Sequence, residues 1–167
     1  YLKLLLSKPS VAGKRAHHGL NLSFPKDSDL PEVVLQGLGE TQVEKSQTRW
    51  AMSAFGCVMG GHHGGKVNFA DGHEDHPIVK GLDNLLTHRM AKRGYKYKQM
   101  ADDVTVLVES EGMPQVWIRD NQPNIKRRLF YVGYDPVDFE KISELREMIA
   151  RAIFWVAKKD IGDYRKP

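Results

Sequence analysis

The residue types that could carry chemistry are concentrated in one glycine-rich run, residues 60–82, which reads GGHHGGKVNFADGHEDHPIVKGL. This run holds four of the seven histidines of the chain, together with two aspartates and one glutamate. Neutral imidazole and carboxylate are groups that bind Zn²⁺ and related metals, and glycine lets a backbone fold tightly around a small site. The run therefore predicts a pocket lined by histidines.

Two chemical roles suit these side chains. The predicted metal ligands are His62, His63, His73, His76 and Asp71, and the expected ion is zinc or another divalent transition metal. As general acids or bases, His62, His63 and His76 would exchange protons with a bound substrate, while Glu74 and Asp75 orient the imidazoles. Structural roles compete with both. His76 precedes Pro77 and could simply order a loop by hydrogen bonding, and adjacent histidines are common in solvated glycine-rich loops.

The single cysteine, Cys57, limits the alternatives. One cysteine cannot form a disulfide within the chain, and it excludes a zinc site built from cysteines. A nucleophilic cysteine would need a tight strand-to-helix turn with one residue between the preceding glycine and the cysteine, whereas Gly56 directly precedes Cys57. The apolar neighbours favour a buried, unreactive thiol, so nucleophilic catalysis by Cys57 is the weaker hypothesis.

The size and charge of the chain fit one domain, residues 1–167, with enough apolar residues for its own core. The net charge is +4, and the densest basic cluster is residues 92–98, KRGYKYK. Such a cluster could contact phosphates and bases, but a solvated surface segment is the simpler interpretation and argues against a nucleic-acid partner.

No apolar run approaches the roughly 20 residues that span a bilayer. A single cysteine suits a reducing compartment, so we expect a cytoplasmic protein.

The elements that must position the histidines are clearest in the second half. Residues 104–110 and 115–119 predict a hairpin, and residues 128–133 predict an apolar strand near the centre of a sheet. Residues 135–159 predict a helix capped by Asp135, with Trp155 as a packing residue and one apolar stripe: Ile142, Leu145, Ile149, Ala152, Ile153 and Val156. Residues 2–6 predict a short strand, and residues 31–38 predict a strand or one helical turn. A strand that leads into such a helix predicts an α/β domain.

Five segments, in this order, resemble segments of the trehalose-utilisation family, usually called ThuA-like. They are residues 50–63 (WAMSAFGCVMGGHH), residues 66–69 (KVNF) with 75–82 (DHPIVKGL), residues 104–108 with Val116 and Trp117, residues 128–131 (RLFY) and residues 152–155 (AIFW). The resemblance implies the class I glutamine amidotransferase-like, flavodoxin-like fold: a mostly parallel sheet flanked by helices, with a late β-hairpin and a C-terminal helix. The family begins with more strands and helices than the first 50 residues hold, so we expect a shortened or incomplete front.

The resemblance also implies a function in the metabolism of sugars, namely trehalose and related disaccharides. In an open α/β sheet, ligands bind beyond the carboxyl ends of the strands, where a histidine loop would form a polar pocket. The resemblance further implies that the amidotransferase cysteine is absent, in agreement with the surroundings of Cys57. The alternative is a non-enzymatic carbohydrate-binding module, or a structural subunit of a homo-oligomer or larger protein assembly, that kept the fold and lost catalysis. Either way, we expect a small carbohydrate-like ligand.

Overall fold

The computed structural model of this chain describes residues 3–6, 32–35, 56–89, 94–120, 128–134 and 136–162. Residues 3–6, 32–35, 58–63, 94–95 and 136–137 are described by their backbone alone. Some features singled out in the sequence lie outside the described residues. These are the first residues of the basic cluster (Lys92 and Arg93), the expected helix cap Asp135, and the first residues of the first family segment, 50–55.

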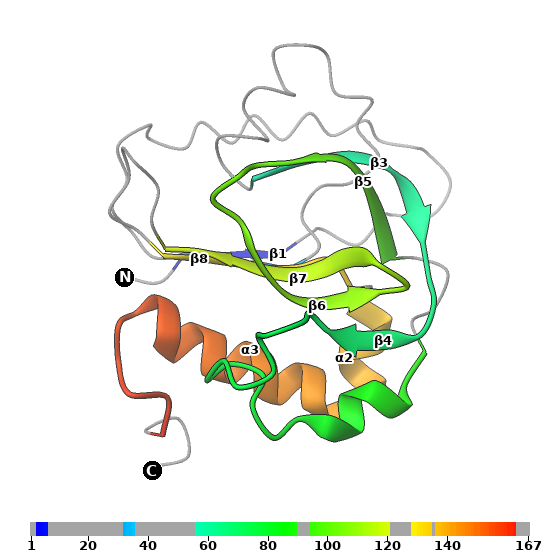
Figure 1. The fold of residues 1–167 in the computed structure, drawn as a ribbon. Coiled ribbons are helices and arrows are strands. Elements are labelled where there is room, and N and C mark those ends of the chain that lie inside the picture. Colours follow the sequence, from blue (N-terminus) through cyan, green and yellow to red (C-terminus); the bar gives the residue numbers. More distant parts are fainter. Residues whose placement is uncertain are drawn as a thin grey trace.

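A six-stranded sheet forms the centre of the fold, in the order β1-β2-β8-β7-β6-β4 (Figure 1). Its strands are β1 (Lys3–Leu6), β2 (Glu32–Leu35), β8 (Leu129–Val132), β7 (Met113–Arg119), β6 (Thr105–Ser110) and β4 (Val67–Phe69). The strands β1, β2 and β8 pair in parallel, whereas β8, β7, β6 and β4 pair antiparallel. The domain is therefore α/β, but the described sheet is mixed rather than mostly parallel. A short hairpin turn joins β6 to β7, and such a turn connects antiparallel strands only.

The late hairpin is confirmed, with a turn shorter than the sequence suggested. Ser110 pairs with Met113, so the turn consists of Glu111 and Gly112 alone, whose φ angles are 48° and 77°. Positive φ at both central residues is the geometry of a type I′ turn, whose twist matches that of the flanking strands. The strand β7 begins before Pro114, which lies opposite Glu109.

A second, two-stranded antiparallel sheet of β3 (Cys57–His63) and β5 (Gly94–Met100) lies over one face of the first (Figure 1). Three aromatic side chains pack between the two sheets: Tyr97 of β5, Trp117 of β7 and Tyr131 of β8. The Trp117 ring stacks on Tyr131 with their centroids 3.9 Å apart, and Tyr97 meets Trp117 edge-on at 5.0 Å. At Gly133 the two sheets approach so closely that a Cβ atom would lie 2.6 Å from Tyr97 Oη.

Helices cover the opposite face of the six-stranded sheet, namely α2 (Pro136–Lys141) and α3 (Ser143–Val156), with the short 3-10 helix η1 (Asp83–Thr87) (Figure 1). The prediction of one helix over residues 135–159 was wrong, because the backbone at Ile142 is extended (φ −111°, ψ 106°). Arg146 stabilises this break. Its guanidinium donates hydrogen bonds to the carbonyl oxygens of Phe139 (2.7 Å) and Glu140 (3.0 Å), which satisfies acceptors that the end of α2 leaves open.

The main core lies between the six-stranded sheet and α3. Four residues of the predicted stripe are buried in it and two are partly buried against it: Ile142, Leu145, Ala152 and Val156, then Ile149 and Ile153. Met148 and Trp155 are buried there as well, which confirms that Trp155 is a packing residue. Every side chain of β8 is fully buried, as expected for a central strand. None of the helices in the described ranges is long and apolar enough to cross a membrane.

Candidate functional site

The direction of β8 gives the sheet a carboxyl end, where β8 stops at Val132, and an amino end, where β8 begins at Leu129. The parallel strands β1 and β2 also stop at the carboxyl end. Because β7 is antiparallel to β8, the first residues of β7 and the β6–β7 turn lie at the carboxyl end, together with the start of β4. The carboxyl end is where open α/β sheets bind their ligands.

The strand β3 brings His62 and His63 to the carboxyl end. His62 pairs with Tyr95 and His63 pairs with Gly94, at the beginning of β5. The chain then runs through two glycines to Lys66, whose carbonyl oxygen accepts a hydrogen bond from the N–H of Glu111 in the β6–β7 turn (3.3 Å). The backbone of the histidine pair therefore lies at the end of the sheet where the sequence predicted a pocket.

The other two histidines of the run, His73 and His76, lie at the amino end, in the loop that follows β4. This loop is tightly turned, because His76 N–H donates to the carbonyl oxygen of His73 and His73 N–H donates to that of Ala70, both at 3.0 Å. The His76 Nδ1 atom accepts a hydrogen bond from the N–H of Ile78 at 3.3 Å. A role for His76 in ordering the loop is thus confirmed. The structure brings His73 and His76 together and separates them from His62 and His63.

The surroundings of His76 come from three other elements. Its ring meets the edge of Trp155, in the last turn of α3, with centroids 5.8 Å apart. The guanidinium of Arg128, which directly precedes β8, lies 4.5 Å from the centroid of the same indole ring. Partial burial lowers the pKa of His76, and the positive charges of His73 and Arg128 lower it further, while Asp120 after β7 opposes them. These effects together favour the neutral form of the His76 imidazole.

The metal prediction gains no support from the described side chains. Among them, no three histidine, cysteine, aspartate or glutamate residues are arranged to hold one ion. Asp71 and Glu74 are exposed, and Asp75 pairs with Lys80 at 3.0 Å between Oδ1 and Nζ. The five predicted ligands also divide between the two ends of the sheet, so one ion cannot collect them all in this fold.

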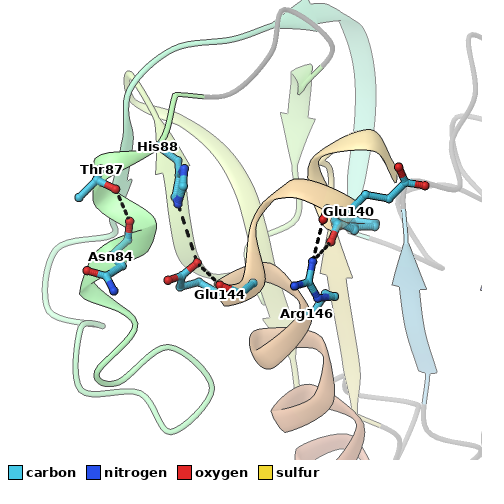
Figure 2. Close-up of polar contacts among 8 residues, drawn as sticks. Asn84, Thr87, His88, Glu140, Glu144 and Arg146 are labelled. Atoms are coloured by element: carbon cyan, nitrogen blue, oxygen red, sulfur yellow. Dashed lines mark hydrogen bonds and ion pairs between the residues drawn. The ribbon is translucent and has the colours of Figure 1, made fainter.

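A further histidine, His88, lies near the carboxyl end and escaped the sequence analysis. It follows η1, next to Arg89, whose backbone bridges to Lys66. Its Nε2 atom lies 3.8 Å from Oε2 of Glu144 at the start of α3, as Figure 2 shows. The two residues are far apart in the sequence, and His88 stands outside the glycine-rich run, so no local pattern could have paired them.

Several donors converge on the Glu144 carboxylate. The pKa of Glu144 is lowered first by a hydrogen bond from its own backbone N–H and then by one from the Ser143 hydroxyl, which lies 3.0 Å away. The His88 imidazole and the Asn84 side chain add smaller contributions, and burial opposes them. A carboxylate at the first turn of a helix also interacts favourably with the helix dipole. Through Asn84 and His88, the Glu144 carboxylate thus connects the start of α3 to η1 and the residue that follows it.

We expect the stability of the protein to depend on the ionisation of Glu144. Because its pKa is lower in the folded state, its contribution is fully present above its ordinary value of 4.5 and is lost as the pH falls through the folded pKa. The Glu144→Gln variant should therefore be less stable than wild type at pH 7, and the difference should shrink as the pH drops below 4.5. Urea unfolding over a pH series measures this. Ser143→Ala should show a smaller effect of the same sign, and a difference that stays constant with pH would contradict the assignment.

Cys57 lies in the small core between the two sheets and is fully buried. Burial raises the pKa of its thiol far above the ordinary value, although the charge of Arg119 opposes the shift. A thiol in this setting is neither accessible nor ionised, so it cannot act as a nucleophile. The expectation of an inert thiol is confirmed.

Comparisons with known proteins leave the family open. No family model and no curated protein matches the chain. One similar solved structure is a protein from Thermoplasma acidophilum that is provisionally described as one of the subunits of GMP synthase. The TM-score is 0.44 and the sequence identity 14%, over 83% of this chain and 61% of that chain. The chain therefore spans less than two thirds of that relative, and a score of this size does not by itself establish a shared fold. None of these comparisons identifies the trehalose-utilisation family.

Proposed function

We propose that this chain is a ThuA-like domain that binds a small, sugar-derived molecule at the carboxyl end of its sheet, with His62 and His63 as the principal polar groups. The observation that carries the proposal is the course of β3, which ends in these two histidines beside the first residues of β5. Ligands of open α/β sheets bind at this end, because loops there leave the sheet and enclose a crevice.

The order of the segments supports the ThuA-like part of the proposal. The segment DHPIVKGL forms the loop between β4 and η1, and the late hairpin, the RLFY strand and the AIFW turn of α3 follow it as β6–β7, β8 and α3. The burial of Cys57 supports the absence of an amidotransferase nucleophile. Imidazole is a common general acid or base, so His62 or His63 could accept a proton from a bound ligand and return it. A divalent metal held by these imidazoles is a second form of the same proposal.

Paired histidine variants provide the test. We expect His62→Ala/His63→Ala to weaken the binding of trehalose, other disaccharides or their oxidised derivatives by at least about tenfold, the loss of about 1.4 kcal/mol. The matched control, His73→Ala/His76→Ala, removes two histidines from the same run but from the amino end, and should bind within about twofold of wild type. Isothermal titration and ligand-observed NMR measure the affinities, and elemental analysis of both variants reports bound metal.

The reverse pattern, with binding lost in the control and kept in His62→Ala/His63→Ala, would place the sugar site at the amino end and contradict the proposal. If none of these sugars binds the wild-type chain, the proposal of a sugar ligand is contradicted.

The alternative of a non-enzymatic module has one observation in its favour. Within the described part of the chain, the side chains form no three-ligand metal group and the cysteine is buried, so two common catalytic devices are not assembled there. Sugar binding without turnover would favour a binding module. A stable oligomer in light scattering, without sugar binding, would favour a structural subunit.

A further inference from the structure

The amino end of the sheet gathers positive and hydrogen-bond-donating groups around Trp155. Arg128 lies over the indole ring and donates one hydrogen bond, from an Nη1 hydrogen to the carbonyl oxygen of Trp155 at 2.8 Å. The cation–π contact and the hydrogen bond together restrict the position of the guanidinium. Among the described residues, this carbonyl is its one hydrogen-bond partner, and the side chain is only half-buried. Several N–H groups of the guanidinium remain available to a ligand.

His76 complements the guanidinium. Because its Nδ1 atom accepts the hydrogen bond from Ile78, the neutral ring carries its proton on Nε2 and can donate there. His73 and Arg128 both lie close enough to His76 to lower its pKa electrostatically. Lys158 and Lys159 follow α3 at the same end of the sheet and are exposed. Asp120, which follows β7 and is also exposed, is the negative group that acts on His76.

The balance of charge decides what kind of ligand suits this group of residues. A divalent cation beside His76 would meet the fixed positive charge of Arg128, which costs free energy. An oxyanion would instead meet a preorganised guanidinium and an imidazole N–H, and such charge-assisted hydrogen bonds are the stronger kind. We propose that Arg128, His76 and His73 form an oxyanion site at the amino end, separate from the proposed sugar site, for the phosphate or carboxylate group of a small ligand.

Inorganic phosphate and acetate are the probes. At pH 7.5 and constant ionic strength, phosphate should shift the NMR signals of His76 and the Trp155 indole saturably, and should leave those of His88, at the other end, unchanged. Phosphate alone would assign the site to a phosphate group, and acetate alone to a carboxylate. A response to either anion, or to both, supports an oxyanion site. No saturable shift with either probe overturns the proposal, as does saturable binding of Zn²⁺ at His73 and His76 with no response to either anion.

Three variants separate binding from folding. Arg128→Gln should weaken anion binding at least about tenfold, because it removes the charged donor of the strongest hydrogen bonds to the anion. Arg146→Gln is the matched control, since Arg146 also donates to main-chain carbonyl oxygens but lies at the carboxyl end, and it should bind as wild type does. Asp120→Asn removes the opposing negative charge and should tighten binding, which damage to the fold would not do. If Asp120→Asn binds no more tightly and Arg128→Gln binds as well as wild type, the assignment is overturned.

Discussion

Replacement of Trp117 by alanine is expected to lower the free energy of unfolding by about 3–5 kcal/mol, the usual cost of removing a fully buried large aromatic side chain. Trp117 is completely buried in the small core between the two sheets. It stacks on Tyr131 and meets Tyr97 edge-on, so one deletion removes two aromatic contacts as well as apolar area. The neighbours come from β5 and β8 and cannot collapse into the space without moving a sheet.

Chemical denaturation followed by circular dichroism measures this loss, and Trp117→Phe is the control. Phenylalanine keeps a stacked ring and should lose markedly less stability than alanine. The cavity that Trp117→Ala would create also lies under the sheet that carries His62 and His63. Tyr97 of β5 packs on Trp117, and β5 pairs with β3. We therefore expect Trp117→Ala to weaken ligand binding at the carboxyl end as well. A loss below about 1 kcal/mol would show that the two sheets are joined by other contacts.

The second large effect is expected for Asp103→Ala, which should cost about 2–3 kcal/mol because it removes both carboxylate oxygens that accept hydrogen bonds from the buried Arg119 guanidinium. Arg119 donates to both carboxylate oxygens of Asp103, from Nε at 3.1 Å to each and from Nη2 to Oδ2 at 2.8 Å. The Arg119 side chain is 7% exposed and that of Asp103 23%, so the pair is shielded from water mainly on the arginine side. This partial exposure places the cost below that of a fully buried pair.

Asp102→Ala is the matched control for this change. Asp102 is the preceding residue in the same turn and carries the same charge, but it is exposed. Its replacement should alter stability by no more than about 0.5 kcal/mol. Equal effects at the two positions, measured by urea unfolding, would show that net charge and not the Arg119 pair stabilises this region.

Local patterns in the sequence determined much of the second half of the fold. The β-branched run before Ser110, the glycine at the turn, Gly112, and the apolar strand of β8 are encoded within a few residues each, so the hairpin and the central strand could be predicted, although the two-residue length of the turn was not. The apolar stripe of α3 follows from a 3.6-residue period. The break at Ile142 does not, because it depends on Arg146 reaching back to the end of α2.

The sequence also determined the nature of the candidate site groups, but only the tertiary structure decided which of them meet. His62, His63, His73 and His76 are close in the chain, yet β4 starts at the carboxyl end and runs toward the amino end between the two pairs. Conversely, Trp155 contacts both His76 and Arg128, and Glu144 lies beside His88, across long stretches of sequence. Spacing along the chain encodes periodicity within one element, whereas the direction of a strand and its partners depend on contacts between elements that no single segment contains.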